Sequence, residues 1–299
     1  MTESGESMAS SKIKVFLEMI KFEHTIFALP FAYLGMVIGS FEKFAQLPTW
    51  SEFLWITLAL VGARSAAMAL NRLIDSTIDK LNPRTATRAI PAGKLSIKET
   101  IIFVLISLFI FIIATLQLSP LAIKLLPLAL IILIFYSYTK RFTWLCHFFL
   151  GAAIGLAPVA AWIAITNEIT FAAVVLYISV ALWTAGFDII YATQDVEFDH
   201  EHGLHSIPVR FGIRNALLIA RVTHVITILG LLLFFTQVNL GIWYIIGIIV
   251  ASFILYYEHS IISPTDLSRL NIAFFTMNGV LSVVIFSFTF IDILVKLFW

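Results

Sequence analysis

The sequence predicts an all-α, polytopic membrane protein with nine transmembrane helices. Of its 299 residues, 60% are hydrophobic and 12% are charged, whereas soluble domains average about 45–50% apolar and about 25% charged residues. The mean hydropathy is +0.98. The apolar residues also gather into runs of about 17–25 residues, the length at which an α-helix crosses a bilayer. These three observations indicate a bundle of membrane-spanning helices.

Nine apolar runs follow one another along the chain, and turn-forming or charged residues separate most of them. The expected spans are 22–41, 53–74, 97–116, 121–138, 144–165, 170–190, 215–236, 240–257 and 270–295. The separating residues, in chain order, include Pro48, Asn82-Pro83, Ser119-Pro120, Lys140-Arg141, Asn167-Glu168, Asn239 and Ser263-Pro264. Prolines inside spans are tolerated where neighbouring helices support the backbone.

The segment before the first span is polar for too long to be a convincing cleaved signal peptide. Residues 1–20 are therefore expected to form a short cytosolic tail without fixed structure, and residues 21–299 to form one transmembrane domain. The single cysteine, Cys146, rules out an intrachain disulfide. The net charge of +1 and the lack of a basic run argue against a nucleic-acid partner.

The distribution of lysine and arginine predicts the orientation, because cytosolic loops of membrane proteins are enriched in these residues. With a cytosolic N-terminus, fourteen of them lie on the cytosolic face and three on the other, namely Lys43, Lys124 and Lys296. A multi-pass protein of the bacterial inner membrane with a cytosolic N-terminus is the expectation.

Polar residues at the ends of the second and sixth spans form two similar clusters. Asn71, Asp75 and Asp79 are spaced by four, and Tyr191, Asp195 and Asp199 repeat that spacing 120 residues later. Residues four apart share one face of an α-helix. The offset fits two four-helix pseudo-repeats plus one further helix. Such repeats would place both clusters across a central cavity, with their loops in the cytosol.

The chemistry of the clusters suits a metal-bound diphosphate. Carboxylate and amide oxygens are ligands for Mg²⁺, which usually shares them with substrate phosphates, and arginine can fork onto phosphate oxygens. Positive-inside topology alone could also explain the two arginines that follow the first cluster, Arg84 and Arg88. The expected metal ligands are Asn71, Asp75, Asp79, Asp195 and Asp199.

Other polar residues near the clusters are further candidates. Asp188 precedes Asp195 by two helical turns and lies deeper in the span. Tyr191 could donate to a phosphate oxygen or be an interfacial aromatic residue. Lys140 and Arg141 add cations on the same face. A histidine trio could instead indicate zinc, although no cysteine assists it; its members are His200, His202 and His205.

Taken together, these motifs resemble the UbiA superfamily of intramembrane prenyltransferases across nearly the whole chain. The motifs are Asn71-x3-Asp75-x3-Asp79, Arg-Thr-x2-Arg-x2-Pro-x-Gly at 84–93, Tyr-x3-Lys-Arg-x-Thr at 136–143, and Tyr191-x3-Asp195-x3-Asp199. The segments Phe27-Ala-Leu-Pro30-Phe-Ala and Tyr191-Ala-Thr-Gln-Asp195 look most like the 4-hydroxybenzoate polyprenyltransferase branch of quinone biosynthesis.

The resemblance implies a bundle around a central cavity in which two Mg²⁺ ions bind the diphosphate of a polyprenyl donor. An aromatic acid then attacks the allylic cation, and Asp188 orients this acceptor or takes its proton. No obligate protein partner is implied. The catalytic residues would be Asp75, Asp79, Asp188, Asp195 and Asp199, and the diphosphate ligands Asn71, Arg84, Arg88, Lys140, Arg141, Tyr191 and His205.

One departure from the family pattern leaves two acceptors open. Many relatives have Gly-x-Lys-Ser after the second motif, whereas this chain has Gly203-Leu-His205-Ser206. The change resembles a sub-branch similar to the enzyme that prenylates a dihydroxynaphthoate in the futalosine route to menaquinone. The acceptor is then 4-hydroxybenzoate or a dihydroxynaphthoate.

Two other protein classes place carboxylates in membrane helices. Ion-coupled transporters do so along ion pathways, but they favour the midplane of the bilayer, whereas these clusters lie at span ends. CDP-alcohol phosphatidyltransferases also use aspartates and a divalent metal, but their Asp-Gly…Ala-Arg run is missing after Asp75.

Overall fold

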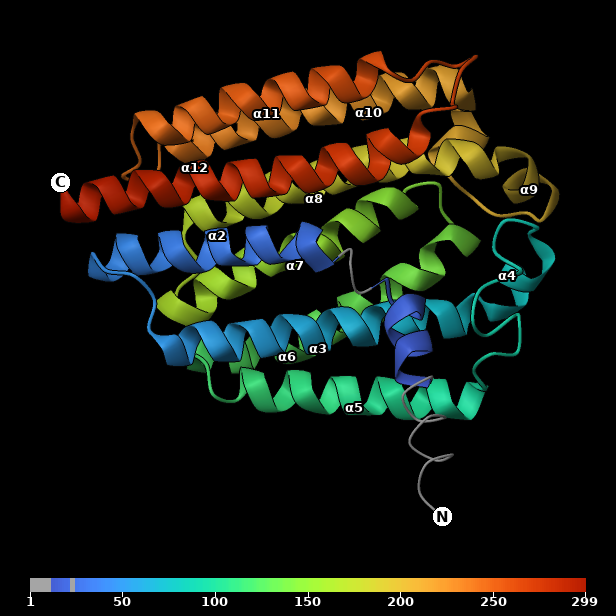
Figure 1. Ribbon diagram of the computed structural model, residues 1–299, viewed down its shortest axis with the longest axis horizontal. Helices are drawn as coiled ribbons and strands as arrows, with labels where there is room; N and C mark the ends of the chain where they lie inside the picture. The colour runs from blue at the N-terminus through green and yellow to red at the C-terminus, as the bar shows by residue number, and fades with distance from the viewer. Residues whose placement is uncertain (1–11, 22–24) are drawn as a thin grey trace.

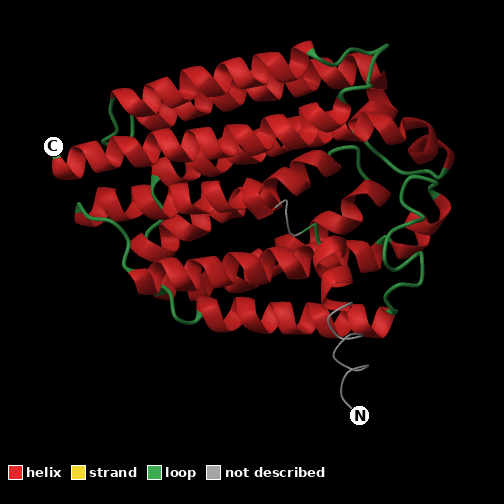
Figure 2. Ribbon diagram, in the orientation of Figure 1, coloured by secondary structure: helices red, strands yellow, loops and turns green. Residues whose placement is uncertain are grey.

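The protein, described by a computed structural model over residues 12–21 and 25–299, is built of helices (Figure 2). No strand occurs in these residues, so the predicted all-α class is confirmed. The long helices are α2 Thr25–Phe44, α3 Trp50–Ile74, α5 Ile97–Thr115, α6 Pro120–Phe135, α7 Cys146–Thr166, α8 Phe171–Ala192, α10 Ile207–Phe235, α11 Ile242–Ser260 and α12 Asn278–Phe298.

Eight helical segments of the described chain are long and apolar enough to cross a membrane. They match the second to ninth predicted spans. The first predicted span, 22–41, begins outside the described residues and overlaps α2, a helix of 20 residues that is not among the eight. The protein is therefore a multi-pass membrane protein, and the count of nine spans stays a prediction.

Hydroxyl residues fix where several helices begin. Thr49 accepts a hydrogen bond from the backbone of Glu52, whose carboxylate accepts one from the backbone of Thr49 in return. Ser96 and Glu99 form the same reciprocal capping box at the start of α5. Each box satisfies backbone N–H groups that a helix leaves free at its first turn.

The helices pack as neighbouring pairs around α8. α8 contacts α7 on one side and α10 on the other, while α3 packs on α5 and α11 on α12 (Figure 1). α8 is the most deeply buried of the candidate spans, whereas α6 has no buried residue. The apolar surface of α6 is compatible with contact to lipid, because its backbone polar groups are satisfied within the helix.

Both aspartate clusters lie at one end of the bundle. The short helices α4 (Ser76–Leu81) and α9 (Val196–Glu201) follow α3 and α8, and Figure 1 draws both at the end away from the C-terminus. Each long helix ends next to its middle aspartate. Asp75 has φ −89° and ψ 0°, and Asp195 has φ −107° and ψ 7°. The matching breaks support the pseudo-repeat.

The breaks correct the expectation that each trio lines one continuous helical face. Asn71 lies on α3, Asp75 at the junction and Asp79 on α4. At the first break the hydroxyl of Ser76 donates to the carbonyl of Leu73. Such local side-chain bonds compete with the helical pattern. In the second cluster Thr193 donates to the carbonyl of Ile190 in the same way.

The segment before the first span is more ordered than the sequence indicates. Residues 12–19 form a short helix, and Met19 and Ile20 are buried. Phe16 stacks on Phe103 of α5 at 4.7 Å between ring centroids. Apolar residues on one face of this helix thus pack against α5. Residues 1–11 lie outside the described part of the chain, and the domain boundary at residue 21 stays a prediction.

The orientation gives a direct test. Ser96 and Ser51 are both exposed. They lie at the starts of α5 and α3, which the charge distribution assigns to opposite sides of the membrane. After replacement of Cys146, a cysteine at position 96 should react with a membrane-impermeant thiol reagent from the cytosolic side only, and a cysteine at position 51 from the other side only. Cytosolic labelling at position 51 contradicts the assigned orientation.

Candidate active site

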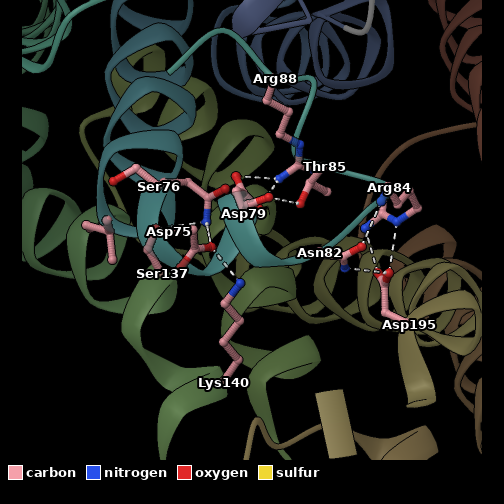
Figure 3. Close-up of polar contacts among 12 residues, drawn as sticks. Asp75, Ser76, Asp79, Asn82, Arg84, Thr85, Arg88, Ser137, Lys140 and Asp195 are labelled. Carbon is pink, nitrogen blue, oxygen red and sulfur yellow. Dashed lines mark hydrogen bonds and ion pairs between the residues drawn. The ribbon is translucent and has the colours of Figure 1, made fainter. Parts of the chain in front are cut away.

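Asp75 lies at the junction of α3 and α4 and is only 2% exposed. Two cations from the segment Tyr136–Arg141 contact it: Lys140 Nζ is 2.6 Å from Oδ2, and Arg141 Nη2 is 3.3 Å from Oδ1 (Figure 3). The side-chain amide of Asn71 also donates to Oδ2, at 3.3 Å. A buried carboxylate needs such partners, because an unpaired buried charge is strongly unfavourable.

Asp79 is 5% exposed and is bound by an arginine from the following loop. Arg88 Nη1 lies 2.7 and 2.8 Å from the two carboxylate oxygens of Asp79 (Figure 3). The hydroxyl of Thr85 donates to the backbone carbonyl of Asp79 at 2.9 Å. These bonds fold the loop back over the end of α4, so that Arg88 lies beside the first cluster.

Asp195 links the two clusters, because its partners come from the loop that follows the first one. Arg84 grips its carboxylate with two parallel bonds, Nε to Oδ1 at 2.8 Å and Nη2 to Oδ2 at 2.5 Å. Asn82 adds a bond from its amide at 3.2 Å (Figure 3). Burial works against the charge of Arg84, but the bonds and charge of Asp195 outweigh it and raise the pKa of Arg84 above its ordinary value.

Tyr191 contacts the arginine that holds Asp195. Its hydroxyl accepts a bond from Arg84 Nη1 at 3.2 Å, and the guanidinium carbon lies 5.5 Å from its ring centroid. The ring stacks on Phe274 at 4.0 Å. Phe274 lies in a π-helical turn, Ile272–Met277, that precedes α12, and such turns often occur at functional sites.

Asp199 and His205 are less constrained. Asp199 is partly exposed, and within the described residues no hydrogen bond or ion pair reaches its carboxylate. The side chain of His205 is exposed, while its backbone N–H donates to the carbonyl of Lys140 at 2.7 Å. The loop that follows the second cluster therefore touches the segment whose cations hold the first.

Asp188 is bound by His147, which was not among the candidate site residues predicted from the sequence. His147 Nδ1 lies 2.7 Å from Asp188 Oδ2, and His147 Nε2 accepts a hydrogen bond from the backbone N–H of Ile207 at 3.3 Å. Because Nε2 is an acceptor, Nδ1 carries the proton and donates to Asp188. His147 is buried, whereas the carboxylate of Asp188 is partly accessible.

The other residue that the sequence reading missed is Asn82. A signal was present for His147, because a histidine within a predicted span is costly and therefore a functional candidate. Asn82 looked like part of a turn with Pro83. Its contact with Asp195 spans 113 residues along the chain, and no local pattern predicts such a contact.

The structure does not support a zinc site at the loop histidines. His202 Nδ1 bonds the carbonyl of Phe198 at 2.9 Å, and the two rings stack. In the described part of the chain, one group brings ligand atoms of three His, Cys, Asp or Glu residues within 4.8 Å of one another, and it contains none of the loop histidines. That group is His224, Glu258 and His259.

An apolar cavity of about 240 Å³ begins near the first cluster. Tyr136, the first residue of the Lys140 segment, lines it together with small residues of α3 and α7 such as Ala63 and Ala157. Arg64 and Thr115 are the other polar residues of its lining. The cavity can hold hydrocarbon, because its surface is almost entirely apolar.

The polar part of the site offers both kinds of group that a metal diphosphate needs. Four carboxylates, those of Asp75, Asp79, Asp195 and Asp199, lie at one end of the bundle. Three of them are bound to cations of the chain. Oxygen donors of this kind fit Mg²⁺, which takes one or two carboxylates and shares the rest of its shell with phosphate and water.

Comparison with known proteins gives the family. The UbiA prenyltransferase family matches residues 28–280. A 4-hydroxybenzoate octaprenyltransferase of Vibrio campbellii is 30% identical over 257 residues, which cover 85% of this chain and 89% of the relative. The enzyme of the same name from Vibrio vulnificus is 33% identical over 201 residues, 67% of this chain and 68% of the relative.

Solved structures agree with the fold. A UbiA homologue from Aeropyrum pernix is 29% identical with a TM-score of 0.81, covering 90% of this chain and 98% of the homologue. A homologue from Archaeoglobus fulgidus, solved with DMAPP and Mg²⁺ bound, has a TM-score of 0.73 at 20% identity, over 94% of this chain and 99% of that protein. The second similarity concerns the fold alone.

Proposed function

The chain belongs to the UbiA prenyltransferase family, and we propose that it transfers a polyprenyl group from polyprenyl diphosphate to an aromatic acid, with Mg²⁺ as cofactor. The observation that carries the proposal is the contact between aspartates and cations at one end of the bundle. Lys140 with Asp75, Arg88 with Asp79 and Arg84 with Asp195 form three such pairs. 4-Hydroxybenzoate is the proposed acceptor, as the names of the relatives suggest.

Mg²⁺ would be held by Asn71, Asp75 and Asp79 on one side and by Asp195 and Asp199 on the other. The amide nitrogen of Asn71 is used by Asp75, which leaves its carbonyl oxygen to face a cation. When bound, the metal neutralises negative charge that develops on the diphosphate leaving group. Four cations of the chain pair with Asp75, Asp79 and Asp195, whereas Asp199 has no ion-pair partner among the described residues and offers its carboxylate to a metal.

The cations would bind the diphosphate. Arg84 holds its carboxylate through two nitrogens, and Arg88 holds both oxygens of Asp79 through Nη1. The planar guanidinium of each can fork onto phosphate oxygens. Lys140 and Arg141 would contact the other end of the group, with Tyr191 as a further donor. These charges are fixed before the reaction and stabilise the departing diphosphate without reorganisation.

The apolar cavity would receive the isoprenoid tail. It begins at Tyr136, four residues before Lys140, and continues between α3 and α7. A donor bound with its diphosphate at Lys140 would therefore lie with its first isoprene units beside Ala67 and Ala63. Apolar walls also exclude water, which would otherwise capture the allylic cation.

Asp188 would orient the acceptor or take its proton. The bond from His147 Nδ1 leaves one carboxylate oxygen of Asp188 without this partner, and that oxygen can accept a bond from a phenolic hydroxyl. As the allylic cation bonds to the ring carbon next to the hydroxyl, that carbon loses its proton. A carboxylate held in place by a buried histidine is suited to accepting it.

An ion-coupled transporter is the alternative from another class. The aspartates lie at helix breaks that end α3 and α8, next to the loops that supply Arg84 and Arg88. Transport sites in repeat-built proteins are typically near the midplane of the bilayer. The terminal position of the clusters therefore favours the enzyme.

A prenyl-transfer assay tests the proposal. Purified protein with radiolabelled polyprenyl diphosphate should prenylate 4-hydroxybenzoate when Mg²⁺ is present, and chelation by EDTA should abolish the product until Mg²⁺ is restored. A panel with benzoate and dihydroxynaphthoate acceptors identifies the preferred ring. Turnover of a dihydroxynaphthoate alone would reassign the acceptor, and no turnover of any aromatic acid would contradict the proposed function.

His205 gives a separate prediction, because a neutral imidazole attracts phosphate less than a cation does. If it meets the diphosphate, His205→Lys should preserve or lower the donor KM at pH 7–8, and His205→Ala should raise it. If it faces the acceptor, His205→Lys should change the accepted acid and leave the donor KM alone. Donor and acceptor KM measured at pH 6 and pH 8 separate these cases. An unchanged donor KM in His205→Ala at both pH values removes His205 from the diphosphate site.

A further inference from the structure

A second cluster of ligand-type side chains, which includes none of the aspartates, lies between α10 and α11. These helices run side by side (Figure 1) and bring together His224, Glu258 and His259. His224 is 2% exposed and Glu258 is fully buried, while His259 is partly exposed. We propose that this cluster is a binding site for one transition-metal ion, best fitted to Zn²⁺, that cross-links the two helices.

The carboxylate of Glu258 carries the argument. Neither of its oxygens has a hydrogen-bond partner, although a buried carboxylate is costly unless it is paired or binds a metal. Asn278 lies next to it, but the amide group of Asn278 donates to the carbonyls of Ala273 and Phe274, each at 3.0 Å. Glu258 therefore points into the cluster with its ligand capacity unused.

The hydrogen bonds of His224 prepare it to be a ligand. Its Nε2 lies 3.2 Å from the carbonyl oxygen of Trp183, and a carbonyl only accepts, so Nε2 carries the proton. The lone pair is then on Nδ1, which faces His259 Nε2 at 2.9 Å and Glu258 Oε1 at 3.9 Å. Histidines that bind metals usually donate their other N–H to a carbonyl in this way.

Distances and donor types favour zinc. Ligands around tetrahedral Zn²⁺ with bonds of about 2.0–2.2 Å lie roughly 3.4 Å apart, and the two separations from His224 Nδ1, 2.9 and 3.9 Å, bracket this value. Two imidazoles and one carboxylate form a common zinc ligand set. For His259 to bind, the proton on its Nε2 moves to Nδ1. A water molecule would complete the shell.

The backbone around the cluster leaves room for the imidazole of His224. A Cβ atom added at Gly186 on α8 would lie 2.3 Å from Nε2 of His224, so only glycine lets the ring approach α8. Trp183, which holds His224, donates its indole N–H to Asn278 at 2.7 Å. A metal here would therefore fix α10 and α11 relative to α8 and the start of α12.

Zinc binding to the full-length protein in detergent tests the proposal. After chelator treatment and desalting, the wild type should bind one equivalent of Zn²⁺ in the presence of excess Mg²⁺, and Co²⁺ should give the absorption of a tetrahedral site. Glu258→Gln and His259→Gln should each lower the affinity at least about 100-fold, more than the loss of an outer-shell partner. His202→Gln, at the exposed residue that follows α9, should bind like the wild type.

Thermal stability gives a second readout that a merely structural role would not reproduce. Without metal, Glu258→Gln should be at least as stable as the wild type, because it removes an unpaired buried carboxylate. With Zn²⁺, the Tm of the wild type should rise with metal concentration, and that of Glu258→Gln should not. Asp292→Asn is the matched control, because Asp292 is buried but accepts backbone bonds from Gly241 and Trp243. Asp292→Asn should lower the Tm both with and without zinc.

Three results would overturn the site. They are the absence of a stoichiometric zinc equivalent in the wild type, equal zinc affinity in the wild type and both ligand variants, and loss of zinc binding in His202→Gln but not in Glu258→Gln. If Glu258→Gln does not fold, His259→Gln decides, because His259 is partly exposed and its replacement leaves less of the core disturbed.

Discussion

Replacing Asp79 or Asp195 by asparagine should reduce kcat at least about 100-fold, or about 2.7 kcal/mol in the barrier. Asparagine keeps the size of the side chain and can still accept from the arginine that each aspartate holds, Arg88 or Arg84. It removes the negative charge that a divalent cation needs. The loss should therefore fall on catalysis and Mg²⁺ affinity, and the protein should remain folded in the membrane.

The measurement is a Mg²⁺ titration of prenyl transfer for each variant, with size-exclusion elution as the test of folding. Asp266→Asn is the matched control, because Asp266 is an exposed aspartate on the loop between α11 and α12, and it should retain full activity. Near-normal turnover in both Asp79→Asn and Asp195→Asn, at low as well as high Mg²⁺, would exclude the two-metal arrangement.

The fold was largely predictable because a bilayer imposes simple rules on sequence. The apolar runs predicted the eight helices of the described chain that can cross a membrane. The repeated motif predicted that both aspartate clusters lie at one end of the bundle, where Figure 1 shows α4 and α9. The periodicity could not show that each helix breaks next to its middle aspartate. At each break a hydroxyl group, that of Ser76 or Thr193, bonds a nearby carbonyl, and residue spacing does not reveal such local contacts.

The sequence predicted several residues that the structure brings together at the candidate site, but neither their pairing nor the presence of His147 and Asn82. Arg84 and Arg88 were expected beside the first cluster, yet Arg84 holds Asp195 from the second. Such a contact depends on the path of the loop after α4, which is set by the bonds of Thr85 and Asn82. The link of His147 to Asp188 joins α7 to α8, and likewise required the packing of the helices.

Arg88→Gln should lower kcat/KM by about 10²–10³-fold, because it removes a cation that would grip the diphosphate and leaves Asp79 buried without its partner. The informative comparison is Arg88→Lys. Lysine preserves the positive charge that sets topology, but its ammonium is a compact point charge and lacks the planar guanidinium that can fork onto two phosphate oxygens. If Arg88 acted only through topology, lysine would restore full activity.

We expect Arg88→Lys to recover only part of the loss and to remain at least about tenfold below the wild type. Lys94→Gln is the matched control: it removes a cytosolic charge from the same loop, where Lys94 is exposed, and should leave kcat/KM unchanged. The measurement is kcat/KM for the prenyl donor in the three variants. Thiol labelling at position 96 verifies that their orientation is unchanged. Equal activity of Arg88→Lys and the wild type would assign Arg88 to topology, whereas loss in both Arg88 variants with unchanged labelling assigns it to the diphosphate.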